Sequence, residues 1–187
     1  MTRVVPDRGR RSNGHLKGRI TLVKGDITKQ DDVEAVVSTI CPDLEIGGTL
    51  NTSLIAAAGE QLDDFILEHI YKPRPGDVFS VPGFDLSAKH IIFAVLPSWR
   101  AGFDLEDRML LRCYRGAMEE AYRLRVKKIA FPALGTGRRI VFPAKRAARL
   151  AVQAVIERLN FQIEEVRFVC KNDTIYDAFK DRLGIKD

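Results

Sequence analysis

Six short segments rich in apolar and β-branched residues alternate along this chain with segments of helical periodicity. The strand-like segments are residues 19–24, 34–40, 77–81, 90–96, 128–131 and 166–170. Apolar residues recur at helical spacing in residues 50–58, 60–70, 105–124, 143–159 and 172–183. Strands that alternate with helices form a sheet with helices on both faces, so we predict a three-layer α/β domain.

The size and composition of the chain indicate one ordinary globular domain. Its 187 residues are 45% hydrophobic and 29% charged, and a chain of this length buries enough surface to fold without disulfides or metals. The longest apolar run, residues 91–96, is far shorter than the ~20 residues that a membrane-spanning helix needs. We therefore expect no membrane-spanning helix.

Cysteine and histidine are too sparse and too scattered to indicate a metal centre. The chain has three cysteines, Cys41, Cys113 and Cys170, and three histidines, none of them at the spacing of metal ligands. We therefore expect no metal, no cofactor and no disulfide framework. A reducing cytoplasm is the expected location.

The net charge of +5 is concentrated at the start of the chain. Residues 1–19 carry six basic side chains and one acidic side chain, so residues 20–187 are neutral overall. We predict a basic, flexible tail over residues 1–17 and a folded domain over residues 18–187. Residues 121–149 form a second basic stretch, with nine Lys or Arg and no acid. RNA binding through residues 1–19 and 121–149 is therefore one functional hypothesis.

Ligands of such sheets bind beyond the carboxyl ends of the strands, so the loops at 25–27, 41–42, 47–48 and 132–139 are candidate sites. In the last loop, Gly135, Thr136 and Gly137 allow backbone N–H groups to surround an anion, although a simple tight turn explains the same glycines. The loop matches neither a Walker A motif nor a full dinucleotide fingerprint. Asp26 fits two roles equally, as a cap for the following turn or as an acceptor for a ligand amino group.

Eight short motifs follow one another along the chain. They are VKGDIT (23–28), EAVVS (34–38), GGTLNTSLIAAAG (47–59), PGDVFSVPGFDLSAKHIIFAV (75–95), PSWR (97–100), IAFPALGTG (129–137), FPAKRAARLAVQAV (142–155) and VRFVC (166–170). Each motif alone is a weak signal, but the series resembles the macro domain family over about residues 18–185. The resemblance implies a three-layer α/β/α sandwich with a mixed six-stranded sheet.

The resemblance also implies a binding site for ADP-ribose or a related ADP-ribosyl group. Asp26 would accept a hydrogen bond from the adenine amino group, beside the backbone N–H of Ile27. Gly47 and Gly48 would let their loop close over the distal ribose. The pyrophosphate would lie against a loop of four residues, Gly135, Thr136, Gly137 and Arg138. Backbone amides would thus hold the phosphates, and one carboxylate would select the base through a charge-assisted hydrogen bond.

Other positions in the expected site depart from the usual family pattern. Cys41 stands where an asparagine normally holds the distal ribose, and Asn51 stands where the hydrolytic branch has an acid. Lys171 replaces an aromatic residue that stacks on adenine, and Phe142 is a candidate for supplying a ring instead. An amide cannot act as a general base, a role typically worth ~10²–10⁴ in rate.

Four functions remain as hypotheses. The sequence favours the binding of ADP-ribose or of an ADP-ribosylated macromolecule over conventional hydrolysis, because the adenine and phosphate positions are better kept than the ribose end. The first alternative is an ADP-ribosyl hydrolase or O-acetyl-ADP-ribose deacetylase that uses substrate-assisted catalysis. The second alternative is an RNA-binding protein, and the third is a site adapted to another ligand.

Overall fold

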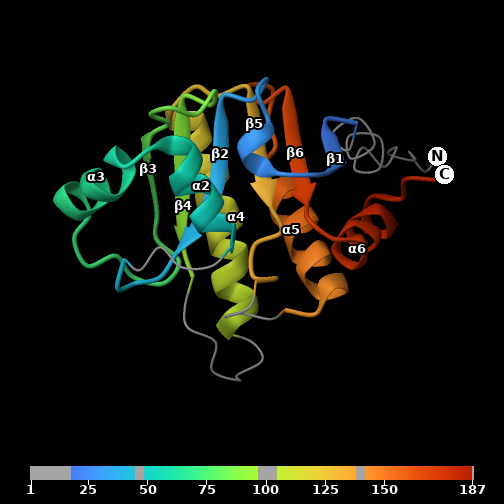
Figure 1. Cartoon of the computed structure of the whole chain (residues 1–187). Helices are drawn as coiled ribbons and strands as arrows, with labels where there is room; N and C mark the ends of the chain where they lie inside the picture. The colour runs from blue at the N-terminus through green and yellow to red at the C-terminus, as the bar shows by residue number, and fades with distance from the viewer. Residues whose placement is uncertain (1–17, 45–48, 97–104, 138–141, 187) are drawn as a thin grey trace, which may run out of the picture.

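The computed structural model describes residues 18–44, 49–96, 105–137 and 142–186 (Figure 1). Its strands are β1 (Ile20–Lys24), β2 (Ala35–Ile40), β3 (Val78–Pro82), β4 (His90–Val95), β5 (Lys128–Pro132) and β6 (Glu165–Cys170). Its helices are α2 (Thr49–Ala58), α3 (Gln61–His69), α4 (Leu105–Arg123), α5 (Ala144–Arg158), α6 (Asp173–Leu183) and the 3₁₀ turn η1 (Ile27–Lys29). Every predicted helix and strand is present, with bounds that differ by one residue at most, and η1 is additional. The predicted basic tail, residues 1–17, lies outside the described residues.

The strands form one six-stranded sheet in the order β1-β6-β5-β2-β4-β3. The five strands β1, β6, β5, β2 and β4 run parallel, whereas β3 pairs antiparallel with β4. The predicted mixed six-stranded sheet is therefore confirmed. Because the five parallel strands share one direction, their carboxyl ends lie at one edge of the sheet, which we call the carboxyl edge.

Helices cover both faces of the sheet, so the predicted three-layer arrangement is confirmed as well (Figure 1). Helices α4, α5 and α6 pack on one face around buried rings such as those of Tyr114, Phe131 and Phe168. Helices α2 and α3 pack with η1 on the other face, where Ile27 and Leu54 are part of the core. The burial of these two apolar layers supplies most of the driving force for folding.

Candidate functional site

The carboxyl edge brings together most of the loops that the sequence singled out. Residues 25–27 follow β1, Lys171 follows β6, residues 133–137 follow β5 and Cys41 follows β2. These four strands are successive neighbours in the sheet. Neighbouring strands lie about 4.8 Å apart, so the ends of β1 and β5 are separated by about 10 Å. The 3₁₀ turn η1 contacts both β5 and α2, which makes these segments one continuous surface.

Asp26 is the residue before η1, and its side chain caps the turn. Its Oδ1 accepts hydrogen bonds of 2.9 Å from both the backbone N–H and the hydroxyl of Thr28. Burial alone would raise the pKa of Asp26, but the two Thr28 donors, with Lys171 and Lys29, outweigh it and lower the pKa. Within the described residues, Oδ2 has no recorded partner. Capping therefore leaves one charged oxygen available to a ligand donor.

Ile27 fixes this turn to the domain through its side chain. The side chain is 2% exposed and belongs to the apolar layer beneath α2 and α3. On the other side of Asp26, the backbone N–H of Gly25 donates to the carbonyl of Cys170 at 3.0 Å, which continues the β1–β6 pairing. The backbone around Asp26 is thus held from both sides.

The loop after β5 is a tight turn that only glycine fits at residue 135. Gly135 has a φ of +80°, and a Cβ there would lie 2.7 Å from the Phe142 ring. The Phe142 amide donates to the Gly135 carbonyl at 2.9 Å. The ring of Phe142 is 5% exposed and packs beneath the turn. Its evident contribution is support of the loop, since so little of the ring reaches the surface.

Two further contacts hold the turn in shape. The hydroxyl of Tyr114, a fully buried residue of α4, accepts a hydrogen bond of 2.9 Å from the Leu134 amide. Thr136 closes the turn, since its hydroxyl donates to the Ala133 carbonyl at 2.7 Å. A Cβ placed on Gly137 would meet no atom of the described residues within 4 Å. The loop is therefore rigid at its base and open at Gly137.

Two residues that depart from the family pattern, Cys41 and Asn51, lie directly after β2 and in α2. Asn51 is 3% exposed, and its side chain bridges α2 and β2. Its Oδ1 accepts from the Ser38 hydroxyl at 2.6 Å, and its Nδ2 donates to the Thr39 carbonyl at 2.7 Å. Cys41 is half-buried directly after β2. Asn51 is therefore engaged in holding the fold together at the position where hydrolytic relatives were expected to place an acid.

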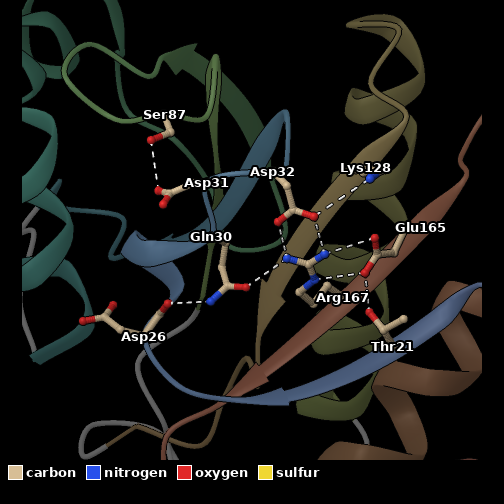
Figure 2. Close-up of polar contacts among 9 residues, drawn as sticks. All are labelled: Thr21, Asp26, Gln30, Asp31, Asp32, Ser87, Lys128, Glu165 and Arg167. Carbon is tan, nitrogen blue, oxygen red and sulfur yellow. Dashed lines mark hydrogen bonds and ion pairs between the residues drawn. The ribbon is translucent and has the colours of Figure 1, made fainter.

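Some predicted residues fall outside the description, and the sequence missed others. Gly47, Gly48 and Arg138 lie outside the described residues. The missed residues are a polar cluster beside η1 that includes Gln30, Asp32 and Arg167 (Figure 2). The available signal was an arginine in the middle of the apolar strand β6.

In the described part of the basic stretch, residues 121–137 and 142–149, most of the positive charges are paired with acids. Several of its side chains lie beside carboxylates from other segments. The pairs are Arg123–Glu120 at 2.6 Å, Lys127–Glu164 at 3.1 Å, Lys128–Asp32 at 3.9 Å, Arg146–Asp107 at 2.8 Å and Arg149–Asp107 at 3.7 Å. This pairing reduces the field available to a polyanion.

A groove with a volume of about 910 Å³ lies between β3 and α4, at the opposite end of the strand order from β1. Four arginines line it, and each pairs with a carboxylate. The pairs are Arg112–Asp77, Arg115–Glu157, Arg123–Glu120 and Arg158–Glu119.

Among the described residues, no His, Cys, Asp or Glu cluster fits a metal ion. No helix in that part of the chain is long and apolar enough to cross a membrane.

Comparisons with known proteins agree with this geometry. The macro domain family model matches residues 37–151. An O-acetyl-ADP-ribose deacetylase of Cronobacter turicensis is 32% identical over 92% of this chain and 99% of its own length. A macro domain-containing protein of Methanosarcina mazei is 37% identical over 89% of this chain and 88% of its own length.

Solved structures show the same architecture. The Oceanobacillus iheyensis macrodomain with ADP superimposes with a TM-score of 0.76 at 28% identity, over 87% of this chain and 88% of the other. A mutant of that macrodomain with ADPR superimposes with a TM-score of 0.78, also at 28% identity, over 87% of this chain and 90% of the other. The family that the sequence motifs predicted is confirmed, and the chain belongs to the macro domain family.

Proposed function

We propose that this protein binds ADP-ribose, free or attached to a macromolecule, at the carboxyl edge of its sheet. The observation that carries the proposal is the placement of the Asp26 turn and the 133–137 turn on either side of the end of β6. In this arrangement the adenine lies at β1, the diphosphate at β5 and the distal ribose at β2. The order of the strand ends therefore matches the order of groups along the ligand.

The chemistry at each position fits the group assigned to it. A carboxylate that accepts a hydrogen bond from an amino group makes a stronger bond than a neutral acceptor does, and the lowered pKa keeps Asp26 charged at neutral pH. In the loop after β5, the amides of Leu134 and Thr136 have protein partners. Within the described residues, none is recorded for the amides of Gly135 and Gly137. Such amides suit a diphosphate.

The relatives support the same ligand. The solved Oceanobacillus iheyensis macrodomain contains ADP in one structure and ADPR in another. Catalysis is the weaker proposal for this chain, because Asn51 is an amide engaged with Ser38 and Thr39. RNA binding is also weaker, since much of the 121–149 stretch is paired with acids. We place the protein in the cytoplasm, in keeping with two buried thiols, Cys113 and Cys170.

The test is a calorimetric titration of the protein with ADP-ribose. Asp26→Asn is the sharpest variant, because asparagine caps turns as well as aspartate does but places a donor where the adenine amino group also donates. Asp31→Asn is the matched control, since Asp31 is an exposed acid on the same loop. We expect Asp26→Asn to lose most of the affinity and Asp31→Asn to keep it.

A second variant tests the diphosphate position. Gly137→Glu adds bulk and negative charge at a position where no described residue would contact a Cβ, so we expect a folded protein that no longer binds ADP-ribose. For the wild type, ligand at 100 times its dissociation constant should add about 2.7 kcal/mol of stability. A folded wild-type protein that shows neither heat nor a thermal shift at millimolar ADP-ribose would refute the proposal.

A further inference from the structure

Arg167 lies at the centre of a polar cluster beside the Asp26 turn (Figure 2). Its side chain is only 13% exposed and projects from the middle of β6. It donates to both carboxylate oxygens of Asp32, at 2.6 and 2.8 Å. It also donates to both oxygens of Glu165, at 2.9 and 3.1 Å. One guanidinium thus joins the sheet to the loop that follows η1.

Gln30 extends this cluster to Asp26. Its Oε1 accepts a hydrogen bond from Nη1 of Arg167 at 3.1 Å. Its Nε2 donates to the backbone carbonyl of Asp26 at 2.8 Å. Two hydrogen bonds therefore lead from Arg167 to the main chain of Asp26, the residue assigned to adenine.

The far side of the cluster is also fixed. Glu165 accepts a hydrogen bond of 2.6 Å from the Thr21 hydroxyl, which ties it to the neighbouring strand β1. The hydrogen bond from Arg167 lowers the pKa of Asp32 to about 2. Burial alone would raise the pKa of Glu165, but the hydrogen bonds from Arg167 and Thr21 outweigh it and lower the pKa. Both carboxylates therefore stay charged at neutral pH, and Arg167 is held between them.

The Thr28 donors fix the Asp26 carboxylate only relative to its own turn, because both belong to η1. The Gly25 amide fixes the start of the turn to the sheet through the Cys170 carbonyl. Beyond that point, the turn is held on its apolar side by Ile27 and on its polar side by Gln30 and Arg167. A hydrogen bond to the adenine amino group tolerates a change of only a few tenths of an ångström in the donor–acceptor distance. Small rotations of the turn would therefore weaken it.

We propose that Gln30 and Arg167 are positioning residues that orient Asp26 for the recognition of adenine. This inference rests on the proposed function and assigns a specificity role to a polar cluster outside the ligand-binding surface. The cluster fixes the orientation of the Asp26 turn relative to the base. Loss of the cluster should therefore reduce discrimination between bases as well as affinity.

Gln30→Glu separates this role from general stability. The substitution keeps an acceptor for Arg167 but replaces the donor to the Asp26 carbonyl with an oxygen. We expect ADP-ribose to bind about 3- to 10-fold more weakly, the factor that corresponds to one lost hydrogen bond. Ser87→Ala is the matched control, since it removes the Ser87–Asp31 bond of 3.1 Å on the same loop without touching Gln30.

The decisive readout is the ratio of affinities for ADP-ribose and for inosine diphosphate ribose, in which a carbonyl replaces the adenine amino group. We expect wild type and Ser87→Ala to prefer ADP-ribose and Gln30→Glu to lose about 3- to 10-fold of that preference. Should Gln30→Glu fail to fold, Gln30→Ala serves for the same ratio. A wild type that binds neither ligand overturns the proposed function. A wild type that discriminates, beside a Gln30 variant with an unchanged ratio, overturns this inference alone.

Discussion

Tyr114→Phe should destabilise the protein by about 1–3 kcal/mol. The substitution removes only the hydroxyl, which leaves the Leu134 amide without its acceptor at 2.9 Å. Leu134 is 1% exposed and Tyr114 is fully buried, so water has no ready access to replace the lost partner. A buried donor left unpaired costs about 1–3 kcal/mol. The second contact, from the hydroxyl to the Pro132 carbonyl, is 3.5 Å long and adds little.

Urea unfolding measures this cost as a loss in the free energy of unfolding. An unchanged slope of that free energy with urea concentration would show that the unfolded state is unaltered. The melting temperature should fall by about 2–4 °C for each kcal/mol in a protein of this size. Tyr122→Phe is the control, because the Tyr122 hydroxyl also accepts from a backbone amide, that of Asn160 at 3.1 Å. Tyr122 is only half-buried and Asn160 is exposed, so water can replace that hydroxyl. If Tyr114→Phe costs no more than Tyr122→Phe, the reasoning about the buried amide is wrong.

Asp32→Asn and Asn51→Asp make two further predictions. Because Arg167 lowers the pKa of Asp32 to about 2, the stabilising contribution of Asp32 is complete above about pH 4 and is lost as the pH falls towards 2. The stability difference between wild type and Asp32→Asn should therefore shrink over that range in urea titrations, and a constant difference would contradict the assignment. Asn51→Asp replaces the donor to the Thr39 carbonyl with an oxygen at a buried site, at a cost of about 1–3 kcal/mol. Burial raises the pKa of a carboxyl group, so the new aspartate is harder to ionise in the folded protein than in the unfolded chain. The loss of stability in Asn51→Asp should therefore be larger at pH 7 than at pH 4, and equal losses at the two pH values would refute the prediction.

Periodicity was enough to locate the helices and strands, because each one buries a regular set of apolar side chains. The capping role of Asp26 was one of two local alternatives, and the Thr28 contacts establish it. The cluster around Arg167 could not be found in this way. Asp32 and Arg167 are 135 positions apart along the chain, and only the pairing of the strands brings their side chains together. Counting charges in residues 121–149 did not reveal their acidic partners for the same reason, because those acids lie mostly in other segments.

The two ends of the proposed site are built by different means, and this has a consequence for what the protein binds. The adenine end depends on a chain of contacts from Glu165 through Arg167 and Gln30 to Asp26, so changes there alter the orientation of the turn. The ribose end at β2 contains Asn51, whose hydrogen bonds to Ser38 and Thr39 serve the fold. Recognition is therefore expected to be strict for the adenosine diphosphate half of a ligand. Differences from hydrolytic relatives should appear in the distal group that the protein accepts and in the fate of that group.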